Sequence, residues 1–263
     1  MKKFQIILIS VVLLVGVVTV VFLKTAYVVP VLMYHSIDDK DQLTKLSVNP
    51  KSFAAQMEFL HRNRYNVITL EHLAVCLKKG ENVPPKTVVI TFDDGYYNNY
   101  QYAYPLLKKY NFPATIFIII SKVGTPGYMG WREIKEMSDS GLITIGSHTI
   151  SHKWLPAMGT KELRSELADS KRILEERTGR PVNTLCYPIG AHDDRVKTEA
   201  ERSGYSCAVA TNPGRYIPND DVYAIKRIKI SRTSDNLFVF WFETSGYYTW
   251  TKEWRGRHLM EME

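Results

Sequence analysis

The chain has 263 residues, of which 23% are charged and 45% hydrophobic, and its formal net charge at pH 7 is +7. This length allows one α/β domain with a full hydrophobic core, and the composition excludes a wholly disordered chain. The positive charge is mild and no basic segment is interleaved with aromatic residues, so we expect no nucleic-acid partner, although an anionic wall or membrane surface would suit it.

The first predicted element is an apolar segment at 4–23, preceded by Lys2 and Lys3. It is long enough to cross a bilayer and longer than the apolar core of an ordinary signal peptide. The two lysines predict a cytoplasmic N-terminus with the rest of the chain outside. Because Lys24 stands where a cleavage site needs a small residue, we expect residues 1–26 to be an uncleaved single-pass anchor in the cell membrane. A secreted protein is the alternative.

Strands and helices alternate along the rest of the chain, and 27–245 is expected to form one domain. A strand-like run at 27–34 ends at His35. The further elements expected are a helix from Pro50 with Asn49 as N-cap, a strand at 67–69, a helix at 70–79 ending at Gly80, a strand at 88–90, a helix at 98–110 bent at Pro105, strands at 114–120 and 141–146, a helix at 160–177, a strand at 184–187, a helix from Asp193 or Asp194 to Ser203, strands at 205–210 and 224–230, and a helix at 237–242 capped by Asp235.

This alternation predicts an α/β fold with a parallel sheet and right-handed crossovers, in which reactive residues gather at the carboxyl ends of the strands. The tail at 246–263 is aromatic and charged but has no periodicity. It either lies along the membrane or the wall, or is disordered. Cys76, Cys186 and Cys207 are expected to be buried free thiols, because three cysteines in a chain of this length do not suggest a disulfide framework.

Two adjacent aspartates follow the strand at 88–90, in the sequence TFDDG at 91–95. Two carboxylates at the mouth of a buried strand are costly unless a cation or hydrogen bonds offset their desolvation. Neighbouring side chains of a strand point in different directions, so Asp93 and Asp94 can take different roles. The alternative for these five residues alone is a strand-ending turn without chemistry.

A second polar cluster, SHTISH at 147–152, follows the strand at 141–146. His148 and His152 would share one face if the segment turned helically, which suits chelation of one transition metal. Asp94 would complete a set of two histidines and one carboxylate, with an open position for water. Ordinary hydrogen-bonded histidines are the alternative for the pair considered alone. Because both clusters follow strands, together they predict a metal site.

The two clusters resemble the first two sequence motifs of the polysaccharide deacetylases, the NodB-homology group of carbohydrate esterase family 4. The similarity extends over roughly residues 28–242. The resemblance implies an irregular (β/α)7 barrel, with Asp93 as general base and with metal ligands at Asp94, His148 and His152. Zn²⁺ is the ion expected from these ligand types, and Co²⁺, Ni²⁺ and Fe²⁺ are alternatives.

Two further positions resemble a circularly permuted branch of this family, the poly-N-acetylglucosamine deacetylases of biofilm systems. That branch supplies a catalytic histidine from an N-terminal Tyr-His pair, and the sequence MYHSI at 33–37 is similar. The resemblance implies His35 as general acid, with a structural histidine as the alternative. The turn YPIG at 187–190 is similar to a turn that lines the substrate groove, which implies that Tyr187 offers a backbone N–H to the oxyanion. A tyrosine packed against the barrel is the alternative.

One departure from the family concerns an arginine that many members carry shortly before this turn and that is missing here. Arg227 interrupts the alternation of the strand at 224–230 and is a candidate to orient Asp93 instead. A solvent-facing arginine is the default alternative.

The resemblance implies metal-dependent N-deacetylation of an extracellular polysaccharide that contains N-acetylglucosamine, with release of acetate. The permuted pattern suggests poly-N-acetylglucosamine, and peptidoglycan stays open. The alternatives are an esterase of other acetylated glycans, such as xylan or chitin oligomers, a phosphoesterase, and a non-catalytic glycan-binding module on the same fold. The sequence does not indicate an oligomeric state.

Overall fold

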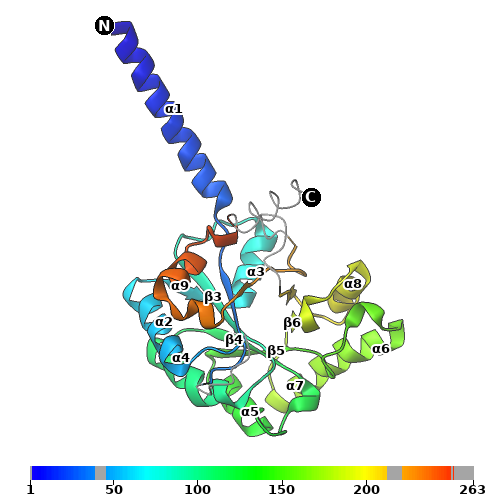
Figure 1. Ribbon diagram of the computed structural model, residues 1–263. Coiled ribbons are helices and arrows are strands. Elements are labelled where there is room, and N and C mark those ends of the chain that lie inside the picture. Colours follow the sequence, from blue (N-terminus) through cyan, green and yellow to red (C-terminus); the bar gives the residue numbers. More distant parts are fainter. Residues whose placement is uncertain (1, 39–45, 212–220, 250, 252–263) are drawn as a thin grey trace, which may run out of the picture.

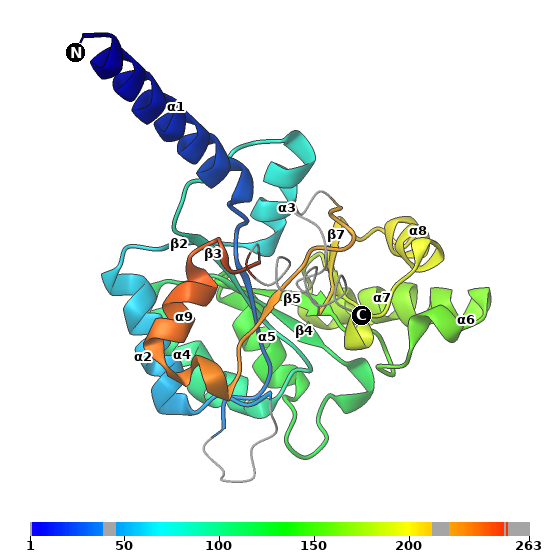
Figure 2. The same ribbon diagram turned by 45° about the horizontal axis from the view of Figure 1, so that its top comes forward.

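A curved parallel sheet surrounded by helices forms the body of the molecule in a computed structural model that describes residues 2–38, 46–211, 221–249 and 251 (Figures 1 and 2). Seven strands follow one another in the order β7-β6-β5-β4-β3-β1-β8, and β2 pairs with β3 beside this path. The strands are β1 (Val31–Tyr34), β2 (Asn66–Ile68), β3 (Thr87–Phe92), β4 (Ala114–Ile118), β5 (Ile143–Ser147), β6 (Thr184–Cys186), β7 (Cys207–Val209) and β8 (Ile228–Lys229).

The sheet curves until its two ends meet. Ile225, just before β8, bridges in parallel to Val209 of β7, and the N–H of Ala210 donates to the Ile225 carbonyl oxygen at 2.9 Å. Every residue of β3 is buried, as expected for a strand covered on both faces, which explains its unbroken apolar and β-branched sequence. The predicted parallel α/β barrel is therefore confirmed, in a partly closed form.

Helices cover the outside of this sheet, and α2, α4 and α9 lie together on one flank (Figure 1). The Asn49 side chain caps α2, and α3 ends at Gly80, whose φ of 64° is in the left-handed region. The helices after the first are α2 (Pro50–Arg62), α3 (Leu70–Lys79), α4 (Tyr104–Tyr110), α5 (Trp131–Asp139), α6 (Thr160–Arg164), α7 (Ser170–Thr178), α8 (Asp194–Arg202) and α9 (Leu237–Thr244). Short 3₁₀ turns lie at Ile120–Lys122, Leu155–Ala157, Pro188–Gly190 and Arg232–Asp235.

Two of the predicted helices are interrupted. A π-helical turn, η1 (Asn99–Ala103), precedes α4 and Pro105, and a second, η4 (Ser165–Asp169), separates α6 from α7. The strand predicted at 224–230 is regular only over Ile228–Lys229, with an isolated bridge at Ile225. The last helix, α9, is capped by the side chain of Asn236 and not by Asp235, because Asn236 Oδ1 accepts the Phe238 N–H at 2.8 Å.

The first helix, α1 (Lys2–Ala26), projects away from the body of the molecule (Figure 1). The structure describes every side chain of this helix between residues 9 and 23. The apolar side chains in this stretch are 41–64% exposed. Counting the described residues alone, no helix is both long and apolar enough to span a membrane. The membrane anchor at 1–26 and the domain limits at 27–245 therefore stay predictions, and most of the tail at 246–263 lies outside the described residues.

Candidate active site

Polar side chains from four strands meet at one edge of the sheet. The strands are parallel, so their carboxyl ends lie at the same edge. In the pairing of β1 with β3, Tyr34 is opposite Phe92, which places the next residues of both strands side by side. The residues that follow or end a strand at this edge are His35 after β1, Asp93 and Asp94 after β3, His148 after β5, and Cys186 at the end of β6.

Asp94, His148 and His152 form a triangle of potential metal ligands, here called the outer donor set. Asp94 Oδ1 lies 3.5 Å from His148 Nε2 and 3.8 Å from His152 Nε2. Two oxygen or nitrogen donors bound tetrahedrally to zinc lie about 3.4 Å apart, so an ion would need only a small contraction of this triangle. His148 Nδ1 lies 2.8 Å from the carbonyl oxygen of Cys186 and donates to it, which leaves Nε2 free to bind a metal. The donors therefore fit a divalent transition ion.

The segment that carries both histidines is an irregular loop and not the helical turn that the spacing suggested. Thr149 has a φ of 65° and His152 a φ of 58°, values that are uncommon outside glycine. The two imidazole rings meet edge to face with their centroids 4.6 Å apart. Asp94 also has a positive φ, of 73°, so a backbone turn adds to strand alternation in directing it away from Asp93. Such conformations persist where the surrounding structure holds them.

Glu166, on the π-helical turn η4, holds this loop. Its carboxylate accepts hydrogen bonds from the backbone N–H groups of Ile150 and Ser151, each at 2.9 Å, and from Ser151 Oγ at 2.5 Å. The His152 N–H donates to Thr149 Oγ1 at 3.1 Å. Glu166 is only 7% exposed, so these charge-assisted bonds are shielded from water and fix the backbone between the two histidines.

Asp93 is bound by Arg227 in a buried, bidentate pair. Arg227 Nη1 donates to Asp93 Oδ1 at 2.6 Å, and Nη2 donates to Oδ2 at 2.7 Å. Arg227 also donates through Nη1 to Thr91 Oγ1 and through Nε to the Ala210 carbonyl oxygen, so its guanidinium is fixed at several points. The candidate role of Arg227 in orienting Asp93 is confirmed, and the solvent-facing alternative is wrong, because the side chain is fully buried.

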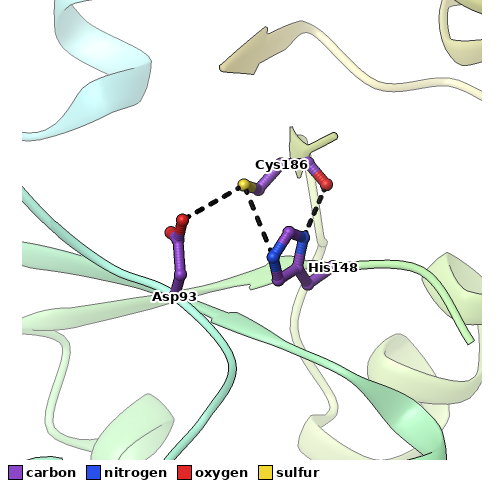
Figure 3. Close-up of side chains that lie close together, drawn as sticks. All are labelled: Asp93, His148 and Cys186. Carbon is purple, nitrogen blue, oxygen red and sulfur yellow. Dashed lines mark hydrogen bonds between the residues drawn. The ribbon is translucent and has the colours of Figure 1, made fainter. Parts of the chain in front are cut away.

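Cys186 lies between Asp93 and His148 (Figure 3). Its Sγ is 3.6 Å from Asp93 Oδ2 and 3.8 Å from His148 Nε2, and it accepts a hydrogen bond from Arg227 Nη2 at 3.1 Å. Asp93, His148 and Cys186 are here called the inner donor set. All three cysteines are buried and free, as predicted, but Cys186 is more than a small apolar side chain because its sulfur takes part in the polar contacts of the site.

The charges of the site follow from burial and from these pairs. Burial alone would raise the pKa of Asp93, but the Arg227 guanidinium holds that pKa well below its usual range. Burial and the neighbouring Asp93 charge raise the pKa of Asp94 to about 6. Burial lowers the pKa of His148 to about 4 and also lowers the pKa of His152. At neutral pH, Asp93 is therefore anionic and both imidazoles are neutral, which is the state in which they bind metals.

His35 approaches the same carboxylate from β1. Its Nε2 lies 3.9 Å from Asp93 Oδ2, and its side chain is 11% exposed. Its Nδ1 is buried and has no hydrogen-bond partner among the described residues. His35 is therefore within reach of the reacting groups, as its predicted role as general acid requires, and that role stays a prediction.

Tyr187 requires a correction. Its backbone N–H donates to the Val209 carbonyl oxygen at 3.1 Å, where β6 pairs with β7, so the donor that we predicted for an oxyanion is already used within the sheet. The phenol ring is fully buried and stacks on His192 with the ring centroids 5.0 Å apart. The alternative, a tyrosine packed against the barrel, describes this position.

Comparison with known proteins identifies the family. A family model described as Polysaccharide deacetylase matches residues 80–208. The chain is 38% identical over 202 residues to YxkH of Bacillus subtilis (strain 168), whose name places it among the polysaccharide deacetylases, and the match covers 77% of this chain and 71% of that protein. The chain belongs to the polysaccharide deacetylase family.

Two further similarities support this membership. The deacetylase is 29% identical over 203 residues to the poly-β-1,6-N-acetyl-D-glucosamine N-deacetylase of Staphylococcus aureus (strain MRSA252), covering 72% of this chain and 70% of the relative. Among solved structures, the Streptococcus pyogenes deacetylase PplD in complex with acetate superposes with a TM-score of 0.74 at 28% identity, covering 81% of this chain and 97% of the other. The expected family and its hydrolytic class are thus confirmed.

Two residues of this deacetylase that contact the site, Cys186 and Glu166, were not assigned to it from the sequence. Cys186 had a usable signal, because it is the last residue of a strand whose carboxyl end faces the site. Glu166 had none, since its contact with the histidine loop depends on the π-helical turn that interrupts the predicted helix at 160–177.

Proposed function

We propose that this deacetylase removes acetyl groups from N-acetylglucosamine units of an extracellular polysaccharide, poly-N-acetylglucosamine or peptidoglycan, by metal-dependent hydrolysis that releases acetate. The observation that carries the proposal is the presence of a three-donor set beside a separate carboxylate, Asp93, which Arg227 keeps anionic. The name of the Staphylococcus aureus relative supports this class of glycan. We propose Zn²⁺ as the ion, with Co²⁺, Ni²⁺ or Fe²⁺ as alternatives.

The roles of the residues follow from their positions. A divalent ion held by Asp94, His148 and His152 would polarise the acetyl carbonyl and make a water molecule more acidic. Asp93 is the general base, because it is ionised beside this position and takes the proton of the attacking water. His35, 3.9 Å from Asp93, gives a proton to the departing nitrogen, since an unprotonated amine is a poor leaving group.

The test is acetate release from a panel of acetylated glycans by the purified chain loaded with Zn²⁺. We expect turnover of poly-β-1,6-N-acetylglucosamine or of peptidoglycan, and a lower rate on chitin oligomers and acetylated xylan. Metal binding without acetate release from any glycan would instead indicate a glycan-binding module. Release from xylan alone would indicate an esterase, and hydrolysis of aryl phosphates in place of glycans would indicate a phosphoesterase.

We also propose that α1 anchors the deacetylase in the cell membrane with the catalytic domain outside. The support is a helix of 25 residues that begins with two lysines and whose apolar side chains are exposed over residues 9–23. Membrane fractionation and sequencing of the mature N-terminus test this. A mature protein that begins near Tyr27 in the culture medium would replace the anchor with a secreted form.

A further inference from the structure

The site contains two overlapping sets of metal donors, and both use the same nitrogen, His148 Nε2. One ion therefore cannot use both sets at once. We propose that the inner donor set, Asp93, His148 and Cys186, is a second metal site that binds thiophilic cations such as Cd²⁺, Hg²⁺ or Cu⁺. An ion bound to the inner set prevents an ion from binding to the outer donor set. A thiophilic cation in the inner set therefore inactivates the enzyme.

The distances of the inner set agree with those of a bound metal. Tetrahedral bonds of about 2.3 Å to sulfur and 2.0–2.1 Å to nitrogen or oxygen place the sulfur about 3.6 Å from each of the other donors. Cys186 Sγ is 3.6 Å from Asp93 Oδ2 and 3.8 Å from His148 Nε2. The two distances from the sulfur are thus as close to metal-binding values as the two distances from Asp94 in the outer set, and all three inner donor atoms lie within 4.8 Å of one another.

The ligand types decide which ion each set prefers. The outer set offers one oxygen and two nitrogens, whereas the inner set replaces a nitrogen with sulfur, the donor that soft cations favour. On binding, the S–H bond of Cys186 breaks, a sulfur–metal bond forms, and the proton leaves to solvent. Arg227 Nη2, 3.1 Å from the sulfur, stabilises the resulting thiolate but opposes the cation. Only a strongly thiophilic ion therefore gains enough to occupy this set.

The outer set provides the entrance. Cys186 is fully buried, but the His152 side chain is 31% exposed, so an ion from solvent reaches the outer donors first. The shared imidazole of His148 then allows it to pass inward to the sulfur. An ion in the inner set occupies a carboxylate oxygen of Asp93 and the lone pair of His148, and so removes the base and one ligand of the outer set together.

Two single substitutions separate the sets. Metal-free full-length protein is titrated with Cd²⁺, and binding is monitored by the ultraviolet thiolate-to-metal charge-transfer band. A separate titration with Co²⁺ is monitored by the visible spectrum of the bound ion. We expect Cys186→Ser to lose the Cd²⁺ band and to bind Cd²⁺ at least ~10-fold more weakly, while Co²⁺ binding stays unchanged. His152→Ala should show the opposite pattern, with Co²⁺ binding weakened and the Cd²⁺ band retained.

The other two cysteines are matched controls, since Cys76 and Cys207 are also buried and free but lie outside both donor sets. Cys76→Ala and Cys207→Ala should keep the Cd²⁺ band. A band that persists in Cys186→Ser, or that disappears together with Co²⁺ binding in His152→Ala, overturns the proposal. The His152→Ala protein keeps the thiol in place, so this result does not depend on how well the Cys186 variant folds. The readouts need no substrate, so they are independent of the proposed deacetylation.

Discussion

Asp93 keeps a negative charge in a buried position because Arg227 is buried with it. Removing one partner of such a pair leaves an uncompensated charge, whereas removing both can be nearly neutral. Arg227→Met should therefore destabilise the fold by about 3–5 kcal/mol, measured by urea unfolding at pH 7. The double variant Asp93→Leu/Arg227→Met should recover most of this loss.

The control for this prediction is Arg172→Ala, which removes an arginine from an exposed ion pair with Glu176 and should leave the unfolding free energy nearly unchanged.

The loss of unfolding free energy caused by Arg227→Met should also depend on pH. Asp93 has a depressed pKa in the folded protein, so its stabilisation is present above the unfolded pKa of about 4 and is lost as pH falls below it. An equal penalty at pH 3 and pH 7 would contradict this account.

Asp94 should make metal binding depend on pH. In the metal-free protein its pKa is raised to about 6, and its carboxyl group must ionise before it can act as a ligand. His148, with a pKa of about 4, is already neutral over most of this range. Co²⁺ affinity should therefore be constant above about pH 6 and fall about tenfold per pH unit between about pH 6 and pH 4. A constant affinity from pH 5 to pH 8, measured by titration calorimetry, would contradict the assignment.

Asp93 and His35 should be needed for turnover and not for binding of the catalytic ion, because neither belongs to the outer donor set. Asp93→Asn should retain Co²⁺ and lose acetate release. His35→Ala should retain Co²⁺ and lower kcat by roughly 10²-fold, the usual scale for an acid–base group. Loss of Co²⁺ from the His35 variant would make His35 a ligand instead.

At the scale of elements, the π-helical turn η4 is the feature that connects a surface helix to the site. The extra residue in such a turn changes the direction of its side chains, and here the turn carries Glu166, which meets the histidine loop. Glu166→Ala should leave the N–H groups of Ile150 and Ser151 without their acceptor. We expect it to weaken Co²⁺ binding by about 10- to 100-fold, as for other groups that orient metal ligands.

Glu133 is the matched control, because it is also 7% exposed and also accepts a backbone N–H, that of Gly130, but it caps α5 and does not hold the loop that carries the two histidines. Glu133→Ala should lower the melting temperature without changing Co²⁺ affinity. Glu166→Gln, which keeps one acceptor oxygen, should recover part of the affinity that Glu166→Ala loses. Equal Co²⁺ affinities for the Glu166→Ala and Glu133→Ala proteins would show that Glu166 has only a structural role.

The sequence predicted the elements that depend on local signals. The capping residue Asn49, the stop at Gly80 and the buried strand before Asp93 are examples, since each depends on neighbours within a few residues. The two motifs likewise identified the outer donor set. Contacts between distant residues were harder to predict: Arg227 is 134 residues from Asp93 along the chain, and Cys186 is 93 residues from it.

The two wrong predictions, a helical turn for the histidine segment and a free N–H at Tyr187, have the same physical origin. A spacing of four residues is compatible with a helical turn, but left-handed conformations at Thr149 and His152 bring the imidazoles together in a loop, and no local propensity favours these conformations. The Tyr187 N–H was assigned by analogy of the turn, whereas pairing of β6 with β7 decides its partner. Sheet pairing and strained loops are properties of the whole fold and override local preference.

At the scale of the whole molecule, α1 and the site are at opposite ends of the strands. Deletion of residues 2–23 should therefore leave Co²⁺ affinity unchanged and should leave kcat/KM on a short soluble oligosaccharide unchanged as well. Both are measured on the purified deletion variant beside the full chain. A loss of Co²⁺ binding would show that α1 supports the folded site.

The path of β1 also determines which substrates an anchored form of this enzyme could reach. The chain leaves α1 at Ala26 and arrives at His35 nine positions later by way of β1, a distance of at most roughly 30 Å at about 3.3 Å per residue. With the helix in the lipid, the reactive side chains would face outward, away from the headgroups. Sugar units in the loose outer layers of the envelope would then be accessible to them, and units attached close to a lipid carrier would be too near the bilayer to reach these side chains.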